Sequence, residues 1–587
     1  MCGICGIISN KENINKKDLF KINRKLNNRG PDGEGYFFKK RFGLAMKRLS
    51  IIDIKNGNQP IKDKDGNQLI CNGEIYNYIE LKKKFFPKLK FSTNSDCEII
   101  LHLYKKFGIK CLKFLDGMFA FCIWDNKNKS FFIARDRFGM KPLYYSKNKN
   151  KFIFSSTSNS IVNCFKNDFS IDESQIYNYL IYGYIPSPNS IWKNIKKLEP
   201  YKYILINKNF NITIKDYKSF DSLNYIKEDY EKILFNNFKI HTRSDVKIGS
   251  LLSGGADSTL VTAYSNKIKK ISDTFIGKFE GKKIDESIIA KKNSELIKIK
   301  PNVIKMNIKE LKRNFNNIID SLDEPISDTA IISTFFLSKA ANKKKLKVLL
   351  SGAGGDELFG GYKRYDDNKY KFMKNLNSKI IIKLLIKFIK FFPAGKYSRY
   401  ILKYLNLGTA YISSISGVDV DVVNKYVKDS NQLALTISKI NYKFKNIDKD
   451  KLRKEFMRFD EKNYLADNIL SLSDQISMYN SVELRLPLLG QIFNKKIKKL
   501  RKFNKDFIKK IIYQKFNFKL VEAKTGFNTP INKWIDNIFF VHKKKNLNNK
   551  ILNKILKVKE IKKKELLNKQ FIFSLIVLNE WLEKNAK

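Results

Sequence analysis

Two short stretches of the sequence, about a hundred residues apart, share an order of features that few folds accommodate. IGSLLSGGADSTL runs from an apolar strand ending in Leu251 and Leu252 into a glycine-rich turn, and then into a helix that opens near Asp257. KVLLSGAGGDELFGGY repeats that order and continues into Asp356 and Glu357. Strands alternate with long helical patterns from about residue 225 onward, which is typical of a doubly wound parallel sheet. The carboxyl ends of such strands share one edge, so we expect the two turns to converge on one crevice.

The first turn, from Ser253 to Ser258, has the composition of an anion site. Glycines let backbone N–H groups approach a phosphate without a Cβ in the way, and the helix that follows adds the positive end of its dipole. No Gly-Lys-Ser/Thr follows, which excludes a Walker A loop, and the spacing differs from the dinucleotide pattern G-x-G-x-x-G. Asp257 and Asp356 are candidate Mg²⁺ ligands beside a bound pyrophosphate, because that ion prefers carboxylate and phosphate oxygens.

The N-terminal region differs from the rest of the chain in its predicted secondary structure. A chain of 587 residues exceeds what one hydrophobic core supports, so we expect at least two domains. From residue 1 to about 165, β-rich runs such as FFIARD and PLYY alternate with turns such as DGNQ and DNKN, which predicts layered sheets. Pro and Ser in YIPSPNS, with the segment from there to about Tyr217, mark the expected connection between the two regions.

The chain opens MCGICGI, and the pair Cys2 and Cys5 has four interpretations. It could be half of a zinc site, a redox pair, the buried start of a strand, or a nucleophile exposed when Met1 is removed. A structural zinc site needs four N or S ligands, but the other cysteines are scattered and the three histidines lack ligand spacing. This argues against a metal and leaves the remaining interpretations open.

Composition restricts the partners and the compartment. Lys and Arg number 114 against 57 Asp and Glu, a formal net charge of +57 that would suit a nucleic-acid partner. The lysines are spread over the whole chain among many Asn and Ile, so we interpret them as a solvated basic surface and do not expect nucleic-acid binding. No apolar run reaches the roughly 18 residues that span a membrane, and IIIKLLIKFIKFF near 380–392 reads as an amphipathic scaffold helix. Seven cysteines and no secretory leader predict a reduced, cytoplasmic protein without a membrane partner.

The turn from Ser253 to Ser258 resembles the pyrophosphate loop of the ATP pyrophosphatases. Together with DELFGGY it resembles the synthetase half of the glutamine-hydrolysing asparagine synthetases. DESI around Asp285 and Glu286, DEPISD at 323–328, SVELRLPLL at 481–489 and AKTGFNTPINKW fit the same family. The resemblance implies that this half binds ATP and Mg²⁺. The positions that it assigns to ATP and pyrophosphate are Leu252, Ser253, Gly254, Gly255, Asp257, Ser258, Ile276, Ser351, Gly352, Asp356 and Lys524.

The same resemblance gives the N-terminal half a class II glutamine amidotransferase domain, with the layered αββα fold of N-terminal nucleophile hydrolases. Removal of Met1 would make Cys2 the first residue, and its α-amino group, with a pKa of about 7.7 to 8.0, could take the thiol proton. In CNGEIYN, Asn72 and Gly73 resemble the oxyanion hole that completes the catalytic set. RGPD at 29–32 and ARDRFGMKPLYY at 134–145 also match the family. The positions implied for glutamine binding are Arg48, Ile52, Asn72, Gly73, Glu74 and Asp96.

The resemblance implies a glutaminase domain at 2–217, a synthetase domain at 225–587 and a homodimer. Ammonia from glutamine would amidate a carboxylate that ATP has adenylated, and the family's acceptor is aspartate. Three positions depart from the family pattern: Ala353 replaces an acidic residue, Gly490 replaces an aspartate, and FSST at 154–157 lacks a glutamate. Ala353 keeps two alternatives open, namely another acceptor such as a surface sugar acid, or a protein without synthetase activity. A nucleic-acid-binding protein on the same scaffold is the third.

Overall fold

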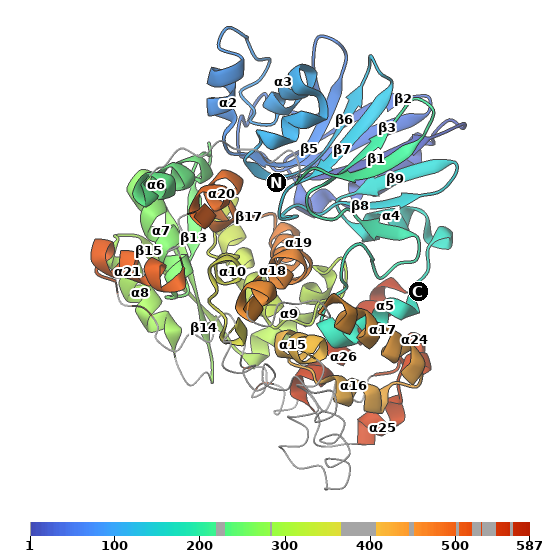
Figure 1. Cartoon of the computed structure of the whole chain (residues 1–587), viewed down its shortest axis with the longest axis vertical. Helices are drawn as coiled ribbons and strands as arrows, with labels where there is room; N and C mark the ends of the chain where they lie inside the picture. The colour runs from blue at the N-terminus through green and yellow to red at the C-terminus, as the bar shows by residue number, and fades with distance from the viewer. Residues whose placement is uncertain are drawn as a thin grey trace.

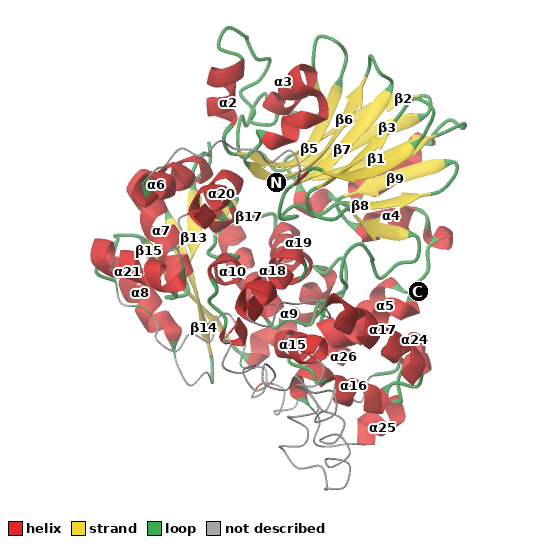
Figure 2. Cartoon of the chain, in the orientation of Figure 1, coloured by secondary structure: helices red, strands yellow, loops and turns green. Residues whose placement is uncertain are grey.

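The computed structural model describes residues 2–586 except 219–228, 282–284, 366–406, 445–450, 500–503, 519, 521–529, 531–533, 535–546 and 564–567. Lys524 and the helix expected near 380–392 lie outside the described residues. In the described part, the N-terminal half is built from two antiparallel sheets, and the other half from a parallel sheet surrounded by helices (Figure 1, Figure 2). No helix of that part is both long and apolar enough to cross a bilayer.

Two six-stranded sheets make up the N-terminal half. The first has the order β10-β8-β9-β1-β3-β2, with β1 (Gly3–Ser9), β2 (Gly33–Lys39), β3 (Phe42–Arg48), β8 (Tyr144–Lys147), β9 (Lys151–Ser155) and β10 (Ile195–Lys197). The second has the order β12-β11-β7-β6-β5-β4, with β4 (Ile61–Lys62), β5 (Gln68–Ile75), β6 (Gly117–Asp125), β7 (Ser130–Arg135), β11 (Lys202–Ile206) and β12 (Ile212–Asp216).

The segment expected to be a connection therefore contains strands, and that expectation was wrong for residues 195–216. Tyr203 of β11 faces the outer core of the second sheet, whereas Ile204 and Ile206 face the core between the sheets. This alternation is the signature of a strand that is covered on both faces. The Pro and Ser punctuation of YIPSPNS is local and ends before β10 begins.

The two sheets are stacked between two layers of helices, because alternate residues of each strand face opposite sides. Ile4 and Ile8 of β1 belong to the core shared with Ile70 of the second sheet, whereas Cys5 and Ile7 belong to the core shared with α1 (Lys16–Arg24). α4 (Ser158–Cys164) packs beside α1, and α2 (Tyr78–Phe85) and α3 (Glu98–Phe107) cover the second sheet. The expected αββα sandwich is confirmed, and Cys5 is a buried strand residue.

The parallel sheet of the second half has the order β15-β14-β13-β16-β17, with β13 (Ile248–Leu251), β14 (Asp273–Phe279), β15 (Lys300–Met306), β16 (Val348–Leu350) and β17 (Glu483–Arg485). The register aligns Ser250 with Leu350 and Leu350 with Arg485, so these three strands end at the same edge. One face packs against α6 (Tyr230–His241), α7 (Ala256–Ile268), α20 (Gln491–Lys499) and α21 (Lys505–Phe516). The other packs against α9 (Ile308–Asp320), α10 (Ala330–Lys343) and α19 (Ser471–Tyr479). The predicted doubly wound arrangement is confirmed.

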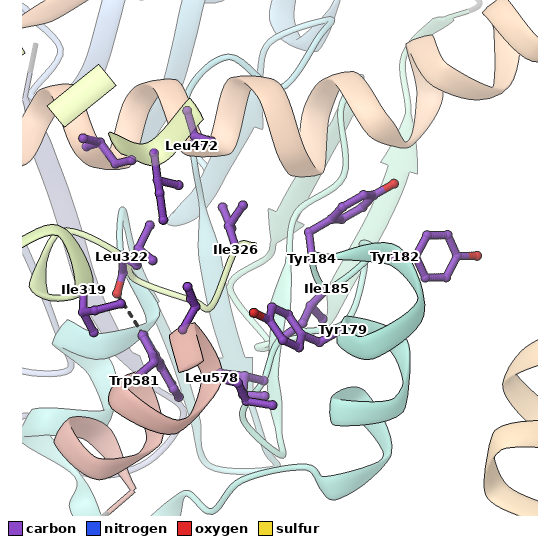
Figure 3. Packing of buried hydrophobic residues seen from close by; sticks show 14 of the residues in the cluster. Tyr179, Tyr182, Tyr184, Ile185, Ile319, Leu322, Ile326, Leu472, Leu578 and Trp581 are labelled. Carbon is purple, nitrogen blue, oxygen red and sulfur yellow. Dashed lines mark hydrogen bonds between the residues drawn. The ribbon is translucent and has the colours of Figure 1, made fainter. Parts of the chain in front are cut away.

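Further helices gather around α5 (Glu173–Tyr182), which comes from the N-terminal part of the chain. They include α15 (Leu407–Ser416), α16 (Val420–Tyr426), α17 (Ser430–Lys443) and α26 (Lys569–Asn585), with α24 (Lys550–Ile555) and α25 (Val558–Lys563) beyond them. The Tyr179 hydroxyl of α5 donates to the Ser574 carbonyl at 2.8 Å. Nε1 of Trp581 donates to the Leu322 carbonyl at 3.0 Å, and Figure 3 shows this bond in the apolar cluster that also contains Tyr179 and Tyr182 of α5. One apolar core thus joins the two halves.

Candidate active sites

Cys2 lies directly before β1 and is only 6% exposed. Its backbone nitrogen donates to Oδ1 of Asn72 on β5 at 3.1 Å, and its carbonyl accepts from Nε of Arg29 at 3.2 Å. Asn72 is fully buried, and its Nδ2 has no hydrogen-bond partner among the described residues. An unpaired buried donor costs about 1 to 3 kcal/mol of folding free energy. The unpaired Nδ2 of Asn72, next to Cys2, is therefore well placed to donate to an oxygen atom of a ligand.

The Cys2 thiol is protonated at neutral pH. Burial raises its pKa to about 11, and the positive chain terminus and a hydrogen bond from the Leu49 backbone offset only part of that rise. A nucleophilic thiolate therefore requires a base. Gly73 follows Asn72 on β5, and a Cβ there would lie 2.1 Å from the Met118 carbonyl oxygen, so the contact between β5 and β6 admits no side chain.

Residues 49–58 form a loop that folds around Arg48, the last residue of β3. Nη1 of Arg48 donates to the Ile54 carbonyl and to Oδ1 of Asn58, each at 3.1 Å. Nη2 donates to the carbonyls of Ile52 at 3.1 Å and Asp53 at 2.6 Å. The structure thus brings the predicted residues Arg48 and Ile52 together. The guanidinium holds the loop in shape, since it binds carbonyls along much of the loop's length.

Two further predicted residues, Glu74 and Asp96, lie in a buried charged cluster. Oδ2 of Asp96 accepts from the Ile75 nitrogen at 2.6 Å, and burial raises the pKa of Asp96 to about 6. Oε2 of Glu74 lies 3.2 Å from Nη2 of Arg485, whose Nε donates to Oε1 of Glu483 at 2.6 Å. Burial raises the pKa of Glu74 well above its usual range, against the attraction of Arg485. Glu74 and Glu483 both contact the Arg485 guanidinium, and Asp96 lies within range of its charge, so carboxyl groups outnumber guanidinium groups here, which favours a cationic ligand.

Arg485 belongs to β17 of the other half, and its guanidinium is fully buried. The sequence singled out the motif SVELRLPLL but not this arginine. An Arg two residues after a Glu in a short strand carries no signal that it reaches another domain. The structure shows that a residue of the parallel sheet contributes to the cluster around Glu74.

The two glycine-rich turns meet at the carboxyl edge of the parallel sheet, so the expected convergence is confirmed. A Cβ on Gly352 would lie 2.6 Å from the Ser258 nitrogen, and one on Gly355 would lie 2.6 Å from Cγ of Asp257. Within the first turn, Oγ of Ser258 accepts from the Ser253 nitrogen at 3.1 Å. The second turn is followed by α11 (Gly355–Phe359), beside α18 (Leu452–Lys462). Both turns therefore form one surface.

Asp257 and Asp356 share a cation in the structure. Nζ of Lys505, the first residue of α21, donates to Oδ2 of Asp257 and, at 2.6 Å, to Oδ1 of Asp356. Asp257 and Asp356 together stabilise the positive charge of the largely buried Lys505 ammonium group. Mg²⁺ also prefers carboxylate oxygens, so the two aspartates fit a Mg²⁺ ion. Sequence reasoning missed Lys505, because one lysine among many at the start of a helix carries no distinguishing pattern.

The other predicted nucleotide residues line or support the same edge. Leu252 and Ile276 are buried together in a small apolar cluster. Gly254 has a φ of +76°, a left-handed conformation that favours glycine. Gly255 is the N-cap of α7, and Ser351 follows β16 directly. Apart from Lys524, outside the described residues, all of the predicted nucleotide positions therefore lie near this edge.

Comparison with known proteins decides the family. Residues 1–218 match the family model described as a glutamine amidotransferase domain, and residues 229–580 match the one described as asparagine synthase. The chain is 30% identical over 564 residues to glutamine-hydrolyzing asparagine synthetase 1 of Bacillus subtilis, an alignment that covers 92% of this chain and 88% of that protein. The chain belongs to the glutamine-hydrolysing asparagine synthetases.

A further asparagine synthetase relative extends the match. A protein of Methanocaldococcus jannaschii that carries the same enzyme name provisionally is 35% identical over 531 residues, covering 81% of this chain and 98% of that protein. ATP is a substrate of asparagine synthetases. The chain is accordingly a glutamine-dependent amidotransferase of the asparagine synthetase type.

One of the three departures from the asparagine synthetase pattern has a physical explanation. A Cβ on Gly490 would lie 2.3 Å from Oδ1 of Asn237, which leaves no room for an aspartate. At FSST, where the family has a glutamate before α4, the Ser158 nitrogen at the start of that helix donates to Asp323 of the other half at 2.8 Å. Asp323 belongs to the family motif DEPISD, so this bond does not account for the missing glutamate. Nothing in the structure explains Ala353.

Proposed function

We propose that the chain converts aspartate, glutamine and ATP into asparagine, glutamate, AMP and pyrophosphate. One observation carries the glutamine-hydrolysing step: the unpaired Nδ2 of Asn72, buried beside Cys2. The convergence of two glycine-rich turns on Asp257 and Asp356 supports the ATP-dependent step. Aspartate as the acceptor follows from the family.

The first step uses both the α-amino group and the thiol of Cys2. Removal of Met1 converts its peptide nitrogen into an amine, which takes the proton from Sγ. Sγ then attacks the side-chain carbonyl carbon of glutamine, and Nδ2 of Asn72 with the Gly73 N–H stabilises the oxyanion. The ammonium group returns its proton to the departing nitrogen, which leaves as ammonia. Water hydrolyses the thioester to glutamate and regenerates the thiol.

Recognition of glutamine falls to the charged residues around this centre. The α-ammonium group of glutamine would enter the cluster of Glu74, Asp96, Glu483 and Arg485, where an added cation balances the excess of carboxylates. Arg48 would attract the α-carboxylate by its positive charge, while its Nη1 and Nη2 go on donating to the loop carbonyls and to Asn58. In accepting that ligand, Arg48 keeps the loop carbonyls of residues 52–54 close to the bound amino acid.

The second step takes place at the edge of the parallel sheet. The N–H groups of the turn at 252–258 would hold the pyrophosphate part of ATP, as the start of a helix favours an anion. Asp257 and Asp356 would hold Mg²⁺, which neutralises charge on the departing pyrophosphate. Lys505 would then turn from the carboxylates toward the phosphate oxygens, because it cannot occupy the place of the metal. We assign Lys524 to the same phosphates on the family resemblance.

The same proposal covers the domain boundaries, the oligomeric state, the compartment and the basic surface. We propose that the domains divide at 2–217 and 225–587 and that the protein is a homodimer. Its seven cysteines are free thiols, which suits a reducing cytoplasm. The basic residues are spread over the whole chain, which supports a solvated surface without a nucleic-acid partner.

A coupled assay tests this function. The enzyme is supplied with glutamine, ATP and Mg²⁺, with and without aspartate, and glutamate, pyrophosphate and asparagine are measured. We expect pyrophosphate release to depend on aspartate. Release that needs a sugar acid instead would assign the alternative acceptor, for which Ala353 is the motivating feature. Cys2→Ala should abolish glutamine use and retain synthesis from ammonium chloride; glutamine turnover by that variant would refute the nucleophile.

A further inference from the structure

The loop at 49–58 is held from both sides, by its own domain and by the synthetase half. Arg48 binds its carbonyls from within, as described above. On the other side lies Asp245, in the short connection between α6 and β13. The inference below rests on the proposed role of this loop and of Arg48 in binding glutamine.

Two hydrogen bonds join Asp245 to the backbone of the loop. Oδ2 of Asp245 accepts from the Asp53 nitrogen at 2.8 Å, and the Asp245 nitrogen donates to the Ile51 carbonyl at 3.0 Å. The contacts bracket Ile52, whose carbonyl binds Arg48. One residue of the synthetase half thus fixes the loop immediately before and after the predicted glutamine-binding position.

The backbone conformation of Asp53 is unfavourable, and its hydrogen bond to Asp245 helps to hold it. Its φ is +53°, which an L-residue adopts only at a cost. The Asp53 carboxylate is already engaged, since Oδ1 accepts from the Asn56 nitrogen at 3.2 Å and Oδ2 from the Asn94 nitrogen at 2.9 Å. The Asp245 carboxylate gives the Asp53 N–H a charged acceptor, and hydrogen bonds to charged groups are stronger than neutral ones.

Asn94 links the loop to the other side of the proposed glutamine pocket, because it lies two residues before Asp96. Through Asp53, the bonds of Asp245 therefore reach both the loop that carries Ile52 and the segment that carries Asp96. A loop free to leave this conformation would have to be reordered each time glutamine binds, and that ordering would weaken binding.

We propose that Asp245 is a positioning residue for glutamine: the synthetase half holds the 49–58 loop in its binding conformation. Asp245 does not touch the reacting atoms. Its loss should weaken glutamine binding about tenfold, the equivalent of one charge-assisted hydrogen bond, and leave the thiol chemistry unchanged.

The test compares Asp245→Ala with Asp245→Asn in the full chain. Asp245 is exposed, so both variants are expected to fold. For Asp245→Ala we expect a tenfold higher KM for glutamine, a kcat within twofold of wild type, and unchanged synthesis from ammonium chloride. Asp245→Asn keeps an acceptor oxygen without the charge and should lie in between. Asp421→Ala, at an exposed aspartate on α16 and remote from the loop in Figure 1, is the matched control and should change nothing.

A binding measurement separates this inference from the proposed function. In a Cys2→Ala background, calorimetric titration with glutamine should give a dissociation constant about tenfold higher when Asp245→Ala is added. Equal constants, or a parallel loss of ammonia-dependent synthesis, would overturn the positioning role while leaving the glutaminase intact. If the wild-type chain neither binds nor hydrolyses glutamine, the proposed function fails and this inference fails with it.

Discussion

Gly352→Ala should disable the ATP-dependent half selectively, because the two glycine-rich turns touch through this residue. The new Cβ would lie 2.6 Å from the Ser258 nitrogen and 2.7 Å from the Asp257 carbonyl carbon, both backbone atoms. To reach ordinary contact at 3.4 Å, the turns must separate by about 0.8 Å, the difference between 3.4 and 2.6. Overpacking of this kind costs about 1 to 3 kcal/mol of stability, which a large domain tolerates.

The functional cost is larger than the cost in stability. A displacement near 1 Å in a catalytic site lowers rates about 100-fold. We therefore expect pyrophosphate release with ammonium chloride, aspartate and ATP to fall about 100-fold in Gly352→Ala. Glutamate release from glutamine should stay within twofold of wild type, because the variant leaves the N-terminal sheets untouched.

The matched control is Gly277→Ala on β14 of the same sheet. Its Cβ would lie 3.4 Å from Cε of Met306 and 3.8 Å from Cε2 of Phe279, both at ordinary contact distance, so both activities should survive. Thermal unfolding of both variants shows that each is folded at the assay temperature. Pyrophosphate release within threefold of wild type in folded Gly352→Ala would refute the reasoning that these turns together form the nucleotide site.

Three further outcomes are expected. Asn72→Ala should lower the kcat of glutamine hydrolysis about 100- to 1,000-fold, measured as glutamate release, with ammonia-dependent synthesis retained; an equal loss in both would contradict an oxyanion role. Burial raises the pKa of Asp96 to about 6, above its unfolded value of about 3.9, because the folded state favours the protonated carboxyl group. The free energy of unfolding should therefore fall as the pH rises from about 4 to about 6. Asp96→Asn should therefore raise the melting temperature at pH 7.5 but not at pH 4, and a gain independent of pH would exclude this cause. Lys505→Met leaves Asp257 and Asp356 without their shared cation and should lower ammonia-dependent synthesis at least tenfold, whereas unchanged pyrophosphate release would remove Lys505 from the site.

Some elements could be predicted from the sequence because their signals are local. The strand, glycine turn and helix around Ser253 follow one another within a few residues, and the parallel topology then requires the turns to meet. Cys2 and Asn72 came from a family resemblance, and the structure places the two residues in contact. The alternation of β11 was local too, but the proline and serine signals just before it led to the wrong interpretation.

The residues that sequence reasoning missed act across long separations. Arg485 reaches Glu74, and Lys505 reaches Asp257, only because the packed sheets and helices bring them together. Asp245 binds the loop at Asp53 for the same reason. In a chain with 114 Lys and Arg residues, nothing in composition or spacing distinguishes one buried cation from its neighbours.

The packing of α5 has a consequence for how such an enzyme can evolve. Tyr179, Leu180, Ile181 and Tyr182 are at most 4% exposed, in a core shared with the C-terminal helices. Recombination that joined residues 1–217 to an unrelated partner would expose this helix, at about 1.5 to 3 kcal/mol for each large apolar side chain. The recipient synthetase half would at the same time lose a piece of its own interior. Inheritance of the two halves as a single gene is therefore favoured by folding as well as by chemistry.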